Sequence, residues 1–342
     1  MAEIKLKDIA AKCGISISTV SRVLSGDTSR KANEETARKI VETARQMGYF
    51  DEKSRRVFQG GTGFSLGCIF ISDHETVVSP FFSEVVRGIQ SEVSHLSRMI
   101  AIEFHTVNIA EPGFEESIEK LALDCAVILG RAPLSIIDFL KTHIPCLLYA
   151  GLNSIGGMDE VLCDARSGMA EAVAYLHSLG HDRIAYVGPA DRQSNVYNEH
   201  RFDGYLKGMR RAGLSADTQY EDVYLSASDG YEGAERLFSQ ETKPTSVVCA
   251  NDMTAIGVMK YLRDAGLRVP DDVSVIGFDN IESSAYMQPA LTTFDVPKLE
   301  LGRLAVKTLV DRKLSPRTCD ITVNLPFTLI VRQSCKEVPH DR

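Results

Sequence analysis

A cluster of short polar side chains lies near the N-terminus, between Gly14 and Leu24. Its members are Ser16, Ser18, Thr19 and Ser21, with the apolar Ile17 and the longer Arg22 among them. Hydroxyl groups bind phosphate oxygens, and an arginine guanidinium can donate two hydrogen bonds to the edge of a guanine. The chemistry that these residue types favour is the recognition of DNA by hydrogen bonding.

Two short helices around Gly14 would position that cluster. Apolar residues at helical spacing mark the buried side of each helix: Ile9, Ala10 and Cys13, then Val20, Val23 and Leu24. Glycine takes a left-handed C-terminal cap without strain, so the first helix should end at Gly14, and the Ser16 hydroxyl should cap the second. This is the layout of a helix-turn-helix, whose second helix enters the major groove. An ordinary helical hairpin is the alternative for these residues alone.

The exposed side of the second helix predicts how DNA would be contacted. Ile17, Ser18 and Arg22 are expected to meet base edges, with Ile17 as a mere core residue as the alternative. Phosphates are expected to contact the hydroxyl groups of Ser16, Thr19 and Ser21. The amide end of the first helix, near Leu6, is expected to bind a phosphate as well.

Residues 1–50 are expected to form a three-helix headpiece. Asn33 would cap a third helix over residues 34–47, which ends before Gly48. Residues 51–63 are polar and end in glycines, which predicts a linker in which residues 52–59 could form two helical turns. Such a short helix needs a docking surface to be stable.

From Leu66 onwards the sequence alternates between short apolar runs and amphipathic stretches. The strand candidates are residues 66–71, 99–104, 126–129, 146–149, 160–163, 183–187, 222–224, 246–250, 273–278 and 291–294, with 327–331 as the last. Helical patterns between them include residues 81–94, 168–179, 200–212, 231–239, 254–265 and 298–309. This alternation predicts an α/β fold with doubly wound parallel sheets. Its length favours two subdomains, with a ligand cleft at the carboxyl ends of the strands.

Composition narrows the class of protein. Of 342 residues, 44% are hydrophobic, yet no run approaches the length of a membrane span. The charged start, with Glu3, Lys5 and Lys7, lacks the apolar core of a signal peptide, so we expect a cytoplasmic location without membrane association. Residues 1–60 contain 12 Lys or Arg and 8 Asp or Glu, whereas the remainder contains 26 and 38. A basic head on an acidic body is typical of a protein whose head meets phosphates.

Cysteine and histidine spacing gives no indication of metal or redox chemistry. The eight cysteines are scattered and no pair has C-x-x-C spacing, so we expect buried reduced thiols, no metal site and no cofactor. The run Gly63–Gly67 has the letters of a G-x-S-x-G nucleophile elbow, but it would lead from a linker into a strand rather than from a strand into a helix. Asp252, the one acidic candidate after the strand at 246–250, is expected to cap the next helix. We therefore predict no catalytic residues and no enzyme.

The chain resembles the lactose/galactose repressor family (LacI/GalR) along nearly its whole length. The matching segments are residues 8–10, 19–24, 48–49, 79–82, 87–89, 179–185, 201–204, 250–252, 270–279 and 291–293. Each segment alone is weak evidence, but their collinear order is specific. The resemblance implies a DNA-binding headpiece, a hinge helix at 51–63 and a core at 64–335 of the periplasmic-binding-protein type. It also implies a first subdomain at about 64–162 and 294–321, and a second at about 163–293 and 322–335.

The resemblance also implies site residues. In the hinge, Arg56 and Phe58 would contact DNA, although Phe58 stands where relatives carry a leucine that wedges into the minor groove. The effector residues would be Phe81, Phe82, Tyr197, Arg201, Asn251 and Asp279. Two departures lie near the cleft, because this chain lacks an acidic residue near Ala150 and a glutamine after Thr293.

A mono- or disaccharide is the expected effector, with nucleobases and sugar phosphates as alternatives. A headpiece of this size reads only half a site, so a homodimer on a near-palindromic double-stranded operator is expected. The residues after the last strand candidate show no heptads, which predicts no tetramer. The main rival class is a free-standing sugar-binding protein, against which the basic head argues. The regulated genes, and whether the effector induces or co-represses, stay open.

Overall fold

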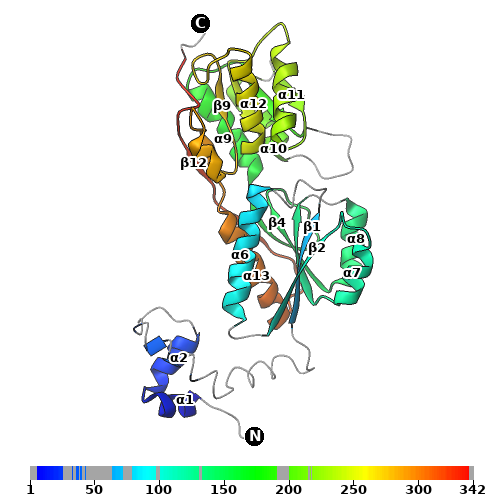
Figure 1. The fold of residues 1–342 in the computed structure, drawn as a ribbon, viewed down its shortest axis with the longest axis vertical. Helices are drawn as coiled ribbons and strands as arrows, with labels where there is room; N and C mark the ends of the chain where they lie inside the picture. Colours follow the sequence, from blue (N-terminus) through cyan, green and yellow to red (C-terminus); the bar gives the residue numbers. More distant parts are fainter. Residues whose placement is uncertain are drawn as a thin grey trace. The chain divides into compact units, whose positions relative to one another are not determined.

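The computed structural model describes residues 6–25, 33, 36–37, 39–40, 43, 64–71, 79–97, 101–130, 133–190, 200–214, 216 and 218–338. Two compact units divide the chain: Met1–Leu66 with Val93–Phe104, and Gly67–Glu92 with His105–Arg342. Figure 1 colours them along the sequence, from blue at the N-terminus to red at the C-terminus.

The N-terminal helices form as the apolar stripes predict. Helix α1 spans Leu6–Cys13 and helix α2 spans Ile17–Ser25. Their buried residues Ile9, Ala10, Cys13 and Val20 gather in one small cluster together with Ile40. Gly14 separates the helices with a φ of 72°, the left-handed conformation that glycine adopts without a Cβ penalty.

A third helix packs against this pair. The Asn33 Oδ1 atom accepts a hydrogen bond from the Thr36 amide at 2.7 Å, so Asn33 is the cap that the sequence predicts. Ile40 lies in that helix and is fully buried. The end of the helix and the whole hinge at 51–63 lie outside the described residues.

The first core sheet has six strands in the order β11-β5-β4-β3-β1-β2. Their bounds are Phe64–Ile71 (β1), Ile102–Asn108 (β2), Cys125–Gly130 (β3), Cys146–Gly151 (β4), Asp159–Cys163 (β5) and Thr322–Leu325 (β11). Helices α7 (Phe114–Leu121) and α8 (Leu134–His143) cover one face, and α6 (Pro80–Leu96) and α13 (Lys298–Leu314) lie on the other (Figure 1). The sheet and α7 and α8 bury one continuous apolar cluster between them.

The second core sheet has four parallel strands in the order β7-β6-β8-β9. The strand bounds are Ile184–Gly188 (β6), Gln219–Asp222 (β7), Ser246–Cys249 (β8) and Ser274–Ile276 (β9). Helices α11 (Ala227–Phe238) and α12 (Asp252–Asp264) bury one face in an apolar cluster. Helices α9 (Ala165–Ser178) and α10 (His200–Ala212) pack closely together. On Tyr186 of β6, the Tyr205 ring of α10 is stacked and the Phe202 ring is tilted. Both sheets agree with the predicted α/β fold.

The chain passes between the two sheets three times. It leaves the first sheet after β5, returns from β10 (Thr293–Asp295) into α13, and leaves again from β11 to β12 (Thr328–Ile330), which pairs with β10 antiparallel. The expectation that residues from 322 belong to the second subdomain is therefore wrong for β11. This strand pairs in parallel with β5 of the first sheet, because the ladder partner of Thr322 is Glu160.

Two strand predictions were misplaced, and both concern sheet edges. The candidate at 99–104 is the strand Ile102–Asn108, and the candidate at 222–224 is Gln219–Asp222. Edge strands bury only part of their side chains, so a continuous apolar run does not mark them. Helices α7 and α8 and the short helix Glu282–Tyr286 were not among the named helical patterns.

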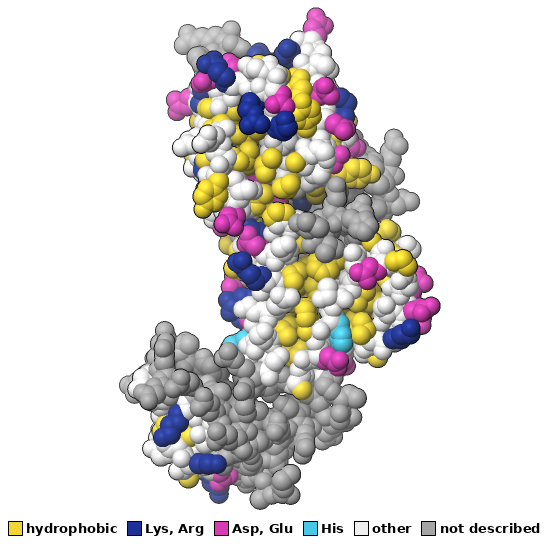
Figure 2. Space-filling view, viewed as in Figure 1, with side chains coloured by type: hydrophobic (Ala, Val, Ile, Leu, Met, Phe, Trp, Pro, Cys, Tyr) yellow, Lys and Arg dark blue, Asp and Glu magenta, His cyan; other side chains and the backbone are white. Residues whose placement is uncertain are grey.

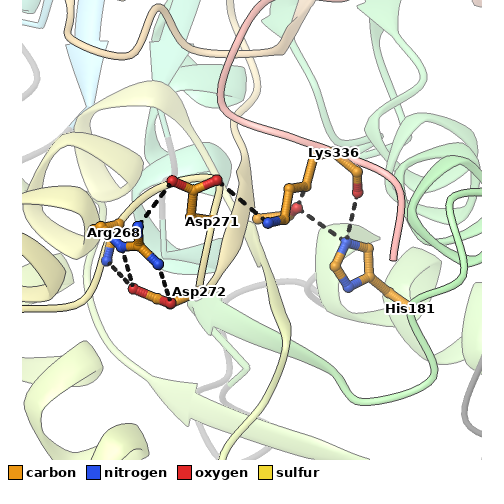
Figure 3. A network of polar contacts seen from close by, with 6 residues as sticks. His181, Arg268, Asp271, Asp272 and Lys336 are labelled. Carbon is orange, nitrogen blue, oxygen red and sulfur yellow. Dashed lines mark hydrogen bonds and ion pairs between the residues drawn. The ribbon is translucent and has the colours of Figure 1, made fainter. Parts of the chain in front are cut away.

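The segment after β12 lies against the second sheet. The Val275 amide donates to the Ser334 carbonyl at 2.8 Å, and the Lys336 amide donates to the Ser274 hydroxyl at 3.1 Å. Figure 3 shows how Lys336 connects His181 with a cluster formed by Arg268, Asp271 and Asp272. This network joins the residue His181 after α9, the segment 268–272 after α12 and the C-terminal segment at Lys336.

Six cysteines are buried as expected, but Cys319 is exposed and Cys335 is partly so, because both lie in segments outside the sheets. Among the described helices, none is long and apolar enough to cross a membrane.

Candidate DNA-reading surface and effector site

Local hydrogen bonds place the polar cluster at the start of α2. The Ser16 hydroxyl accepts from the Thr19 amide at 3.2 Å and lies 2.8 Å from the Thr19 hydroxyl and 3.0 Å from the Ser18 hydroxyl. Ser16 is thus the N-cap that the sequence predicts. The amides and hydroxyls at this helix end form a positive, donor-rich surface that favours anions.

The outer side of α2 carries an exposed apolar residue. The Ile17 side chain is 52% exposed, while Val20 on the opposite side is fully buried. Ile17 is therefore outside the headpiece core, which removes the alternative that it is a core residue. Figure 2 shows Lys and Arg side chains on the described surface of this unit. Leu6 is half-buried and contacts the headpiece cluster, so only its backbone end is suited to a phosphate.

Arg22 folds back along its own helix. Its Nε atom donates to the Ser18 carbonyl at 3.1 Å, and its Nη2 atom lies 3.5 Å from the Thr19 hydroxyl. A contact with a base edge requires this half-buried side chain to rotate away from the helix. Arg56 and Phe58, together with Tyr197, lie outside the described residues.

Three predicted effector residues gather at one edge of the second sheet. Asn251 follows β8, Asp279 follows β9, and Arg201 lies in the first turn of α10. Their exposed fractions are 8%, 5% and 7%. Carboxyl ends of parallel strands meet at one edge, which is where open α/β sheets bind ligands. Arg201 is close enough to Asp279 for its charge to lower the pKa of that carboxyl.

Asn251 is already engaged by the fold. Its Oδ1 atom accepts from the Thr254 amide at 2.8 Å, and its Nδ2 atom donates to the Leu225 carbonyl at 3.2 Å. Asn251, and not Asp252, is therefore the cap of α12, because α12 begins at Asp252, two residues earlier than the pattern at 254–265 indicated. A ligand can still use the second lone pair of Oδ1.

Asp252 serves a different purpose from capping. This fully buried carboxylate accepts from the Ile281 amide at 2.8 Å and from the Thr293 hydroxyl at 2.6 Å. Burial raises the pKa of Asp252, and the neighbouring Asp279 raises it further. Burial likewise raises the pKa of Asp279, while Arg201 and Lys298 lower it. Two carboxyls in one buried region oppose each other's ionisation.

Phe81 and Phe82 stand at the start of α6, on the other side of the core. Their rings meet edge to face with centroids 5.1 Å apart, Phe81 being buried and Phe82 half-buried. The two rings therefore contact each other, and an aromatic pair of this kind suits the C–H surface of a sugar.

Sequence reasoning missed Lys298, which is 4% exposed and binds the segment after β9. A lysine directly after Pro297, at the start of a helix with a buried face, was the available signal. In the part of the chain that the structure describes, no group of three or more His, Cys, Asp or Glu could hold a metal ion.

Two family models match the chain. The model of bacterial regulatory proteins of the lacI family matches residues 5–51, and the model of a periplasmic binding protein-like domain matches residues 173–335. Among curated relatives, the transcriptional repressor MelR of Bacillus subtilis is 30% identical over 97% of both chains. The transcriptional repressor CytR of Escherichia coli K12 is 29% identical over 98% of this chain and 97% of the relative.

Solved structures show the same architecture. A LacI family regulator of Enterococcus faecium with bound ribose has a TM-score of 0.68 at 27% identity, covering 80% of this chain and 99% of that one. The lac repressor dimer bound to operator and the anti-inducer ONPF has a TM-score of 0.69 at 22% identity, covering 98% and 100%. The chain belongs to the lacI family of bacterial DNA-binding regulatory proteins.

Proposed function

We propose that this protein is a transcriptional repressor of genes for carbohydrate use. It binds a near-palindromic double-stranded operator as a homodimer in the cytoplasm, and a small sugar-like effector releases it. The observation that carries the DNA-binding part is the surface of α2, where the 52% exposed Ile17 stands among hydroxyl groups at a helix N-terminus. An isoleucine there adds nothing to the headpiece core, but it suits the methyl group of a thymine.

Each part of the N-terminal region has its own role in this proposal. Ile17, Ser18 and Arg22 meet base edges. Phosphates are bound by Ser16, Thr19, Ser21 and the amide end of α1 at Leu6. Residues 1–50 act as the headpiece, residues 51–63 as the hinge and residues 64–335 as the core, with Arg56 and Phe58 of the hinge contacting the DNA.

The effector is bound at the core by charged and aromatic groups together. Arg201, Asp279 and Asn251 bind hydroxyl groups, while Phe81 and Phe82, with Tyr197, supply the apolar wall. A mono- or disaccharide is the proposed class. Support comes from the buried Arg201 and Asp279 at the strand ends and from the ribose-bound regulator of Enterococcus faecium, which is 27% identical. The protein acts by binding alone, without a cofactor or a catalytic step.

Operator binding is tested with the full chain and the promoter of its own gene in a gel-shift titration. We expect a discrete complex that survives an excess of unrelated duplex, since specific complexes exceed non-specific ones by about 10³-fold or more. Equal affinity for promoter and unrelated DNA would contradict the proposal and favour the free-standing binding protein.

Effector binding is tested by a thermal-shift screen of ribose, disaccharides, nucleosides and sugar phosphates, followed by titration of the operator complex with each hit. Arg201→Ala should bind operator normally and lose the response, because the guanidinium no longer holds the hydroxyl groups. The control is Arg210→Ala, an exposed arginine on the same helix, which should respond as the wild type does. A normal response in Arg201→Ala would show that the site lies elsewhere.

A further inference from the structure

Lys298 is a buried lysine at the first position of α13, with 4% of its surface exposed. Its Nζ atom donates to three backbone carbonyls: that of Asp279, that of Asn280 at 3.3 Å and that of Val296 at 3.3 Å. A buried ammonium is costly unless it is fully hydrogen-bonded, and these three acceptors match its three donors. Lys298 is therefore specifically accommodated rather than accidentally buried.

The segment that Lys298 holds has an unusual backbone. Asp279 and Asn280 have φ angles of 113° and 48°, which side chains other than glycine rarely adopt. Such strain persists only where the surroundings over-determine the conformation. Here the Asn280 amide group donates to Asp295 at 2.9 Å, Arg332 donates to the Asn280 Oδ1 atom at 2.7 Å, and Lys298 binds both carbonyls.

The strained conformation leaves one polar atom available. Asp279 is only 5% exposed, so its Oδ1 atom is largely shielded from water. This atom nevertheless accepts no hydrogen bond from the described residues. A buried carboxylate oxygen without a donor costs free energy, which a ligand hydroxyl can recover. The backbone conformation therefore determines where this acceptor points.

Lys298 also joins the two halves of the core. Helix α13 packs on strands of the first sheet, and it crosses α6 so closely that a Cβ on Gly302 would come within 2.0 Å of the Val85 carbonyl. The segment at Asp279 follows β9 of the second sheet. Lys298 thus connects the segment that carries the acceptor with the helix pair whose other member begins at Phe81 and Phe82.

We propose that Lys298 is the positioning residue of the effector site: by holding the Asp279 backbone carbonyl, it fixes the direction of the Asp279 carboxylate for the effector and ties this segment to α13. This inference rests on the proposed role of Asp279 in effector binding. A displacement of Asp279 is passed to the first subdomain through the hydrogen bond between Lys298 and the Asp279 carbonyl. This connection adds to the three places where the chain crosses between the sheets. Lys298 itself does not touch the effector.

The charge of Lys298 gives this role a distinctive signature. The titratable or charged groups near Asp279 include Arg201 of α10, Asp252 of α12, Asp295 of β10, Cys163 at the end of β5 and Lys298 of α13. Arg332, from the segment after β12, contacts the neighbouring Asn280. Of these, Arg201 and Lys298 lower the pKa of Asp279 against the effect of burial, which raises it to about 7. Loss of the Lys298 charge must raise that pKa further, whereas loss of packing alone does not.

The test uses full-length Lys298→Met, which keeps the volume and removes charge and donors, with Lys307→Met as the matched control on the same helix. The titration of Asp279 is followed by carbon NMR of aspartate-labelled protein, and amide hydrogen exchange is measured at residues 279–281. We expect the titration midpoint to rise by about one pH unit and the amides to exchange about tenfold faster in Lys298→Met. In Lys307→Met both should match the wild type.

An unchanged midpoint and unchanged exchange in Lys298→Met would overturn the inference. If that variant does not fold, Lys298→Gln, which retains donors but not charge, must show the same rise of the midpoint. Neither measurement needs an effector, so their failure concerns Lys298 alone, whereas a normal response of Arg201→Ala overturns the proposed effector site. For any hit of the screen, Lys298→Met must also weaken binding at least about tenfold, and wild-type affinity would show that Lys298 positions nothing for the effector.

Discussion

The side chains at the strand ends of the second sheet differ in how many of their polar atoms already form hydrogen bonds within the protein. The Asn251 side chain makes two hydrogen bonds to its own surroundings, and both oxygens of Asp252 accept one each. Asp279 differs, because its Oδ1 atom is buried without a donor among the described residues. A ligand hydroxyl therefore gains most at Asp279.

The first residue-scale prediction concerns the bases that α2 reads. Exchanging Ile17 and Ser18 should change the preferred operator, because the apolar and hydroxyl groups trade places on the exposed side of the helix. The discrimination between bases should change by about 1–3 kcal/mol per affected position. Binding selection from a random operator library measures it. The thermal shift of the core with its effector should stay the same, and an unchanged operator preference would contradict the assignment.

The second residue-scale prediction concerns His181, whose ring contacts the Lys336 carbonyl of the C-terminal segment (Figure 3). Its ring lies 3.0 Å from the Thr245 hydroxyl, 2.9 Å from that of Ser274 and 3.2 Å from the Lys336 carbonyl. Burial lowers the pKa of His181 below the ordinary histidine value of 6.5, and the hydrogen bond to the Lys336 carbonyl partly opposes this shift. The ring is thus neutral in the folded chain at pH values where the unfolded chain is already protonated.

Stability from neutral His181 is complete above pH 6.5 and decreases as the pH falls below it, because the unfolded state then binds more protons. Urea unfolding at pH 7.5 and 5.5 measures the decrease, which per proton amounts to at most about 1.4 kcal/mol for each pH unit. His181→Gln cannot take up that proton, so it should show a smaller decrease. An equal decrease in both proteins would exclude His181 as the cause.

At the scale of elements, the closest packing in the first subdomain is the crossing of α6 and α13. Gly88 lies against the backbone of Leu299, and Gly302 lies against the backbone of Val85. Helix backbones come this close only where the residue at the contact lacks a Cβ, as Gly88 and Gly302 do. The buried Glu92 of α6 then pairs with Arg303 of α13 at 3.2 Å, which fixes the register of the two helices.

Gly302→Ala should lower the melting temperature, because its Cβ would meet the Val85 carbonyl at 2.0 Å and push the helices apart. Overpacking of this kind costs about 1–3 kcal/mol. Helix propensity alone would stabilise the alanine variant by about 1 kcal/mol, so the two effects have opposite signs. Calorimetry of the variant decides between them, and a melting temperature equal to or above that of the wild type would show that the crossing is loose.

At the scale of the whole molecule, three chain crossings and the Lys298 contact connect the two sheets of the core. Two subdomains joined in this way can change their mutual orientation when a ligand binds one orientation better than the other. Such a two-state core is what the proposed release from operator requires.

Light scattering on the full chain at micromolar concentration should give the mass of two chains. A single helix-turn-helix reads one half-site, so a twofold dimer matches a near-palindrome. A stable tetramer would contradict the prediction. A monomer that binds the palindrome with the same affinity as a single half-site would contradict it as well.

The sequence by itself determined the local features of this protein. The caps at Gly14, Ser16 and Asn33, the α10 bounds at His200–Ala212 and the strand–helix alternation all follow from patterns within a few residues. These features are predictable because capping and amphipathic periodicity act over one or two helical turns.

Only the tertiary structure decided which distant segments meet. It assigned β11 to the first sheet, displaced the edge strands β2 and β7 from the apolar runs, and joined Lys298 to the carbonyls of Asp279 and Asn280. Strand order and the burial of a lysine depend on contacts between residues far apart in the chain, and no local pattern encodes them. The sequence therefore located the candidate site at the strand ends, whereas the fold determined which of its atoms are available to a ligand.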